Sequence, residues 1–178
     1  MESKKYFNGF TGVLGLTFIC LTLSVSLLFT PNTFAGEGKK DVVEISQKDV
    51  PLVITKPGSY RLVSNLTVSS PIATAILVVT PNVTIDLNGF TISGPGKDTG
   101  EGSFGINTNT MDNVVVRNGM IKLFGNVALH LCGPNNRAEN VLVTESIHGI
   151  FVGRSGVIDH CQVAFCTQKT SLSAIDVS

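Results

Sequence analysis

An imperfect repeat runs through most of the 178-residue chain and strongly limits the folds that it can adopt. Each repeat opens with a small residue followed by Ile or Leu. The openings are Ala75, Gly105, Ala128, Gly149 and Ala174, so the steps are 30, 23, 21 and 25 residues. A period of about 20 to 30 residues with variable insertions is typical of a solenoid, in which each repeat buries its apolar face only against its neighbours.

Each repeat also contains a residue suited to a tight corner. Asn82, Asn113, Asn140 or Gly156 stands directly before a Val-rich segment. Because Asn and Gly accept a positive φ most readily, we expect a recurring turn at this position. Apolar residues then recur at every second position, which indicates strands with one buried face. The residues expected in the core are Val83, Ile85, Leu87, Val114, Val116, Val141 and Val143.

Two architectures fit these strands. Asn88-Gly89 and Asn118-Gly119 are typical two-residue hairpin turns and would give an antiparallel sandwich or barrel. Hairpins explain neither the small-residue openings nor the Asn before each Val-rich segment. A right-handed parallel β-helix explains both, with Asn-Gly as a second corner inside each coil. We therefore predict an all-β parallel solenoid.

The segments Ile54–Val68, Ala75–Val78 and Asn82–Gly94 resemble the opening of pectin-lyase-like right-handed β-helix proteins. The resemblance implies an N-terminal cap with the first strands over residues 36–74. It also implies a short β-helix of about four to five rungs over 75–178. The chain stops as Ala174 opens a new repeat, so we expect a C-terminally truncated solenoid. The fold hosts lyases, hydrolases, epimerases and adhesins, and does not by itself specify a function.

Residues 1–35 read as a secretory signal peptide. Lys4 and Lys5 precede a long apolar stretch, and Thr33-Phe34-Ala35 places small residues before a cleavage site between Ala35 and Gly36. An apolar stretch of about 20 residues is also long enough to remain as a membrane anchor. We predict a secreted, periplasmic or cell-envelope protein, with membrane contact only if this segment stays uncleaved.

Charge and cysteine content exclude several classes. Thirteen basic and thirteen acidic residues give no net charge, which argues against a dedicated nucleic-acid binder. After loss of Cys20, the three cysteines Cys132, Cys161 and Cys166 form a poor disulfide framework. We expect them to be small buried hydrophobes, with one bridge plus one free thiol as the alternative. No Cys-x2-Cys pair is present, so zinc is not expected.

Candidate catalytic residues are few. Asp86 is expected to hold a turn or to face water, and His130 and His148 to face outward without a catalytic partner. Asn107-Thr108-Asn109 matches a polygalacturonase motif only in part. The segment Val157-Ile-Asp-His-Cys161 is similar to the calcium-binding strand of pectate lyases. That similarity makes Asp159, beside His160, the one candidate calcium ligand, although we expect a solvated Asp159 and neither a metal nor a cofactor.

These observations predict an exported β-helix protein without a catalytic site of its own. Its expected role is structural, adhesive or polysaccharide-binding, with a polysaccharide or an envelope component as partner. The alternative is the N-terminal part of a polysaccharide-active enzyme, namely a pectate-lyase-like lyase.

Overall fold

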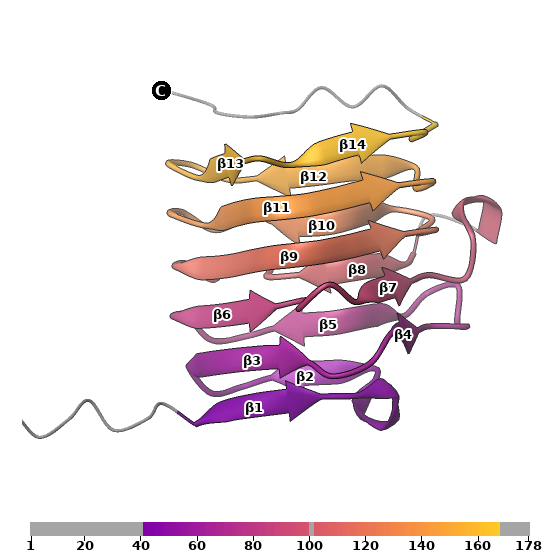
Figure 1. Cartoon of the computed structure of the whole chain (residues 1–178). Coiled ribbons are helices and arrows are strands. Elements are labelled where there is room, and N and C mark those ends of the chain that lie inside the picture. The colour runs from indigo at the N-terminus through magenta and orange to yellow at the C-terminus, as the bar shows by residue number, and fades with distance from the viewer. Residues whose placement is uncertain (1–40, 100–101, 168–178) are drawn as a thin grey trace, which may run out of the picture. The chain divides into compact units, whose positions relative to one another are not determined.

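The computed structural model describes residues 41–99 and 102–167, and these residues form two parallel β-sheets with almost no helix (Figure 1). The predicted signal peptide, its cleavage site at Ala35 and Gly36, and the repeat at Ala174 lie outside the described residues. No helix in the described part is long and apolar enough to cross a membrane.

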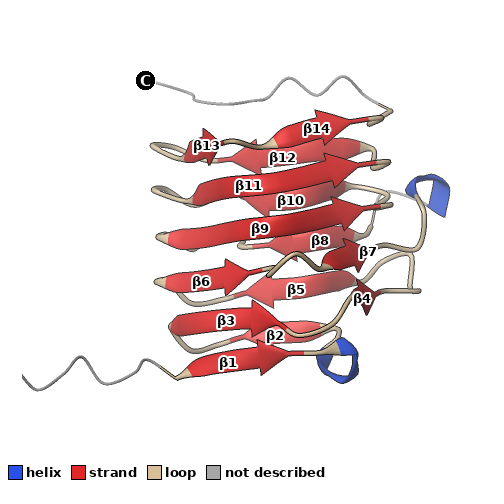
Figure 2. Cartoon of the chain, in the orientation of Figure 1, coloured by secondary structure: helices blue, strands red, loops and turns tan. Residues whose placement is uncertain are grey.

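Strands of the described residues belong to sheet A or sheet B, and the two short 3₁₀-helices lie at the edge of the stack (Figure 2). Sheet A contains β1 (Val42–Ile45), β3 (Gly58–Leu62), β4 (Leu66–Thr67), β6 (Val83–Asp86), β7 (Thr91–Ser93), β9 (Val114–Lys122), β11 (Arg137–Thr144), β13 (Val157–Asp159) and β14 (Gln162–Ala164). Sheet B contains β2 (Leu52–Ile54), β5 (Thr74–Val78), β8 (Phe104–Asn107), β10 (Val127–Leu131) and β12 (His148–Val152). The 3₁₀-helices are η1 (Gln47–Asp49) and η2 (Lys97–Thr99).

The chain passes repeatedly between the two sheets, and every described strand pairing is parallel. Sheet B has the order β2, β5, β8, β10, β12, so each strand pairs with its counterpart one repeat along the chain. The antiparallel alternative is therefore wrong: Asn118-Gly119 lies inside β9, and Asn88-Gly89 connects two strands of the same sheet. The arrangement is consistent with a β-solenoid.

The small-residue openings form one row across sheet B. The registers of β5, β8, β10 and β12 align Ala75, Gly105, Ala128 and Gly149. The residue after each opening is also buried, so two consecutive residues point into the protein at the start of these strands. The interior has room for the first of these two residues only if it is small. This explains why Ala or Gly recurs at the opening of each repeat.

The first corner of each coil is only partly as predicted. The four residues in this row, all with φ between 53° and 59°, are Asn82, Asn113, Asn135 and Ser155. The prediction is right for the first two and wrong for Asn140 and Gly156. Strand β11 starts at Arg137, so Asn140 falls inside it and aligns with Asn118. A polar beginning, Arg137-Ala-Glu139, concealed the true start of this strand.

The core is a stack of aliphatic residues between the two sheets. All seven residues expected there are at most 1% exposed. Val141 and Val143, however, do not repeat the positions of Val114 and Val116: they align with Gly119 and Ile121 in the second half of β9. The first half of β11 contributes Ala138 instead, opposite Val116. Residues 42–67 already supply strands to both sheets.

Candidate functional site

Sheet A bends at a second row of residues with positive φ. Asn88 (52°) separates β6 from β7, Asn118 (61°) and Asn140 (51°) lie within β9 and β11, and His160 (49°) separates β13 from β14. A residue in the left-handed region interrupts extended backbone, and Asn tolerates this region best among residues with a side chain. The outer surface of the sheet is hollowed along this bend.

The hollow is a groove of about 430 Å³. Of the described residues, those that line it are Gly89, Asn118, Gly119, Asn140, Val141, Leu142, His160 and Gln162, and none of these is a carboxylate, a lysine or an arginine. Amide and imidazole groups both donate and accept hydrogen bonds, and the leucine offers an apolar contact. This combination suits a neutral ligand rich in hydroxyl groups.

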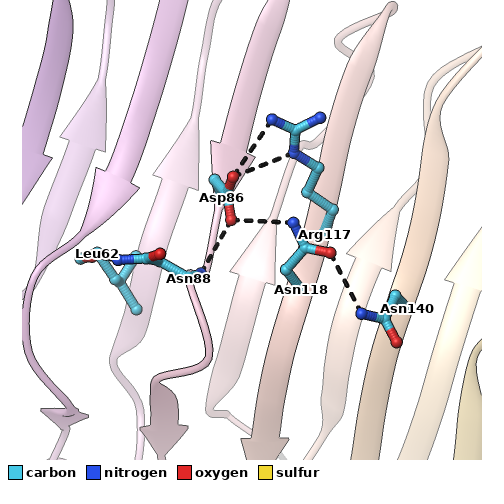
Figure 3. Close-up of polar contacts among 6 residues, drawn as sticks. All are labelled: Leu62, Asp86, Asn88, Arg117, Asn118 and Asn140. Carbon is cyan, nitrogen blue, oxygen red and sulfur yellow. Dashed lines mark hydrogen bonds and ion pairs between the residues drawn. The ribbon is translucent and has the colours of Figure 1, made fainter.

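The amides of the groove are held in a hydrogen-bonded ladder (Figure 3). Asn140 Nδ2 donates to Asn118 Oδ1 at 3.2 Å, and Asn118 Nδ2 donates to Asp86 Oδ1 at 3.2 Å. Each bond crosses from one coil to the next. The ladder fixes the rotamer of each amide before a ligand arrives, which reduces the entropy lost on binding.

Asp86 anchors this ladder. Its Oδ1 also accepts a bond from the backbone N–H of Asn88 at 2.9 Å, and its Oδ2 lies 3.2 Å from Nη2 of Arg117. Its side chain is 13% exposed. The expectation that Asp86 holds a turn is confirmed, and Arg117 neutralises its charge.

The ladder ends at Asn140, and His160, its register neighbour, stands where the next asparagine would be. Its Nδ1 lies 2.7 Å from Asp159 Oδ1, and the two side chains are 84% and 56% exposed. With Nδ1–H donating to the carboxylate, Nε2 remains an acceptor at the groove. Asp159 is solvated, as expected. Among the described residues no three His, Cys, Asp or Glu side chains gather around a common point, and the candidate role of Asp159 as a calcium ligand is untested.

The cysteines differ from expectation at one position. Cys132 is exposed, because it follows the last residue of β10 and already belongs to the turn. Cys161 and Cys166 are half-buried against the core, and all three are free thiols. Burial raises the pKa of the Cys161 thiol, which keeps it in the unreactive protonated form.

A second cluster, not foreseen from the sequence, lies on the outer face of sheet B. The ring of His130 packs between Phe104 and Phe151, with centroids 5.6 and 5.1 Å away, and its Nδ1 lies 3.1 Å from Asn107 Oδ1. Register explains the contact, because His130 aligns with Asn107 on one side and with Phe151 on the other. Burial lowers the pKa of His130.

This cluster gives the fold a pH dependence. The folded state favours the neutral imidazole of His130, because burial lowers its pKa. The contribution of His130 to the free energy of unfolding is therefore complete above the unfolded-state pKa of about 6.5, and it is lost as pH falls through the lower pKa of the folded state. We expect His130→Phe to flatten the fall in unfolding free energy between about pH 7 and 5. Urea unfolding at several pH values measures this. His148→Phe, on the same face, serves as control and should leave the slope unchanged; an unchanged slope in His130→Phe would contradict the prediction.

Several sequence candidates are not brought to the groove. His148 lies on sheet B, and Asn107 bonds to His130. The sequence pattern did not identify Asn140 and Gln162, which line the groove, as part of a binding site. The signal that could have found Asn140 is its 22-residue offset from Asn118 within the repeat. Comparison with protein-family models, curated proteins and solved structures found no match for this chain.

Proposed function

We propose that this chain is an exported polysaccharide-binding protein that catalyses no reaction of its own and binds its ligand in the groove of sheet A. The observation that carries the proposal is the row of prearranged amides, Asn118 and Asn140, beside His160 and Gln162. Successive coils of a parallel sheet are about 4.8 Å apart, so the row offers repeated hydrogen-bonding groups along the stack. An extended polymer with repeated hydroxyl groups fits this pattern.

The proposal includes a right-handed parallel β-helix of the pectin-lyase-like class. Parallel strands joined by crossovers are right-handed in nearly all proteins, which supports this sense of coiling. Export is supported by Lys4 and Lys5, the apolar stretch and the small-residue site at Ala35. The expected location is therefore the cell envelope or the exterior.

A tryptophan in the groove tests the proposal. Leu142 lines the groove on the outer face of β11, so Leu142→Trp fills it without entering the core. We expect binding to a retained polysaccharide to weaken at least about tenfold, because a ligand must displace the indole. Affinity electrophoresis in gels containing neutral, acidic or amino polysaccharides measures this. The matched variant is Leu77→Trp, on the outer face of sheet B. Equal retardation of both variants would place binding elsewhere.

A lyase fragment remains the second candidate because Asp159 and His160 meet at the groove and Glu139 lies opposite Asp159 in register. A carboxylate pair can hold calcium, and calcium can hold a uronate. The assay is the calcium-dependent appearance of unsaturated uronate absorbance. Its appearance with this chain would favour the lyase over the binding protein.

A further inference from the structure

A column of charged side chains runs along the outer face of sheet A next to the groove. Each member is the register partner of the next. In order along the stack the members are Glu44, Arg61, Asp86, Arg117, Glu139 and Asp159. The sign of the charge alternates over the first five positions, which stabilises cross-strand neighbours.

The alternation fails at the last step. Glu139 and Asp159 are neighbours of the same sign. Glu139 is neutralised by Arg137, whose Nη1 lies 3.0 Å from its Oε1. Asp159 contacts His160 instead, and no lysine or arginine pairs with it among the described residues. Glu44 and Asp159, at the two ends of the column, are its carboxylates without an ion pair to a lysine or arginine among the described residues, and Asp159 is the one that contacts a groove residue, His160.

The Asp159 carboxylate does not line the groove itself but lies next to it, in contact with the lining residue His160. His160 lines the groove and holds Asp159 at 2.7 Å, whereas Asp86, beside the other end of the ladder, is neutralised by Arg117. A ligand in the groove thus meets neutral amides along its length and a negative charge at one end. The carboxylate of Asp159 would repel a uronate there and attract an ammonium group. Both effects act within the Debye screening length, about 10 Å at 0.1 M salt.

We propose that the groove selects polysaccharides that carry amino groups over those that carry uronates, and that Asp159 determines this specificity. The inference rests on the proposed polysaccharide-binding function and adds the class of ligand. An exposed ion pair contributes little to affinity, so Asp159 sets a preference while the amides and Leu142 supply most of the binding.

Three oligosaccharides of equal length test the inference: one of glucosamine, one of N-acetylglucosamine and one of galacturonate. Their dissociation constants for the full chain are measured by calorimetry at low salt with a chelator present, so that calcium cannot bridge a uronate to Asp159. We expect the amino oligomer to bind about threefold more tightly than the neutral one, and the uronate oligomer to bind most weakly. Asp159→Asn should remove the preference for the amino oligomer over the neutral one.

Asp98→Asn is the matched control, since Asp98 is an exposed carboxylate outside the groove that pairs with Lys97. It should keep the preference. A uronate oligomer that binds as tightly as the amino one, or a preference that survives in Asp159→Asn, would overturn the inference while binding of the neutral oligomer still supports the proposed function. Absence of binding to all three oligomers would overturn both.

Discussion

Replacing Asn136 by leucine is expected to lower the free energy of unfolding by about 4 kcal/mol, because each buried polar group left without a partner costs about 1–3 kcal/mol. Asn136 is fully buried at the first corner. Its Oδ1 accepts the backbone N–H of Val114 at 2.8 Å, and its Nδ2 donates to the carbonyls of Met111 at 2.9 Å and Gly133 at 3.0 Å. Leucine has nearly the same volume and none of these groups, so three backbone groups lose their partner.

Urea unfolding followed by far-UV circular dichroism measures the loss. Asn65→Leu is the matched control: Asn65 is exposed, and its Oδ1 accepts one bond from Thr91 N–H at 2.9 Å, which water can replace. We expect the control to cost about 1 kcal/mol or less. If Asn136→Leu also lowered the free energy of unfolding by only about 1 kcal/mol, the stability of the corner would not depend on its buried amide.

Much of the solenoid could be read from local pattern. Alternation along Val83, Ile85 and Leu87 depends only on the period of a strand, and the small-residue openings depend on a steric need that recurs in every coil. Both signals lie within a few consecutive residues. The prediction went wrong at β11, where one strand crosses both halves of sheet A and its polar first half resembles a loop.

The candidate site was harder to predict from the sequence, because its side chains come from different coils of the solenoid. Asn118 contacts Asn140 and Asp86, which lie 22 and 32 residues away in the chain. Asn136 and Asn140 are the same residue type four positions apart, yet one is buried and the other is exposed. Register decides between them, and a shift of a few residues in the predicted start of β11 exchanges their roles.

Gly105→Ala is expected to lower the free energy of unfolding by about 3 kcal/mol, at the upper end of the cost of overpacking a core. A Cβ at Gly105 would collide with the carbonyl oxygen of Ala128 and would lie 2.6 Å from Cγ2 of Ile121. Both belong to the interior of the stack, and the carbonyl is part of the neighbouring strand β10. Relief of the clash therefore requires movement of a whole strand and of the ring of Phe124, 3.2 Å away.

Gly149→Ala, in the same row, separates this steric effect from the general effect of adding a methyl group. The three atoms nearest to its added Cβ all belong to the side chain of Val163, the first 2.6 Å away, and Val163 is 37% exposed. Because that side chain can rotate toward solvent, we expect a cost below about 1 kcal/mol. Denaturant unfolding of the two variants tests the row directly. Equal costs would contradict the argument that the Ala128 carbonyl and Ile121 make Gly105 more crowded than Gly149.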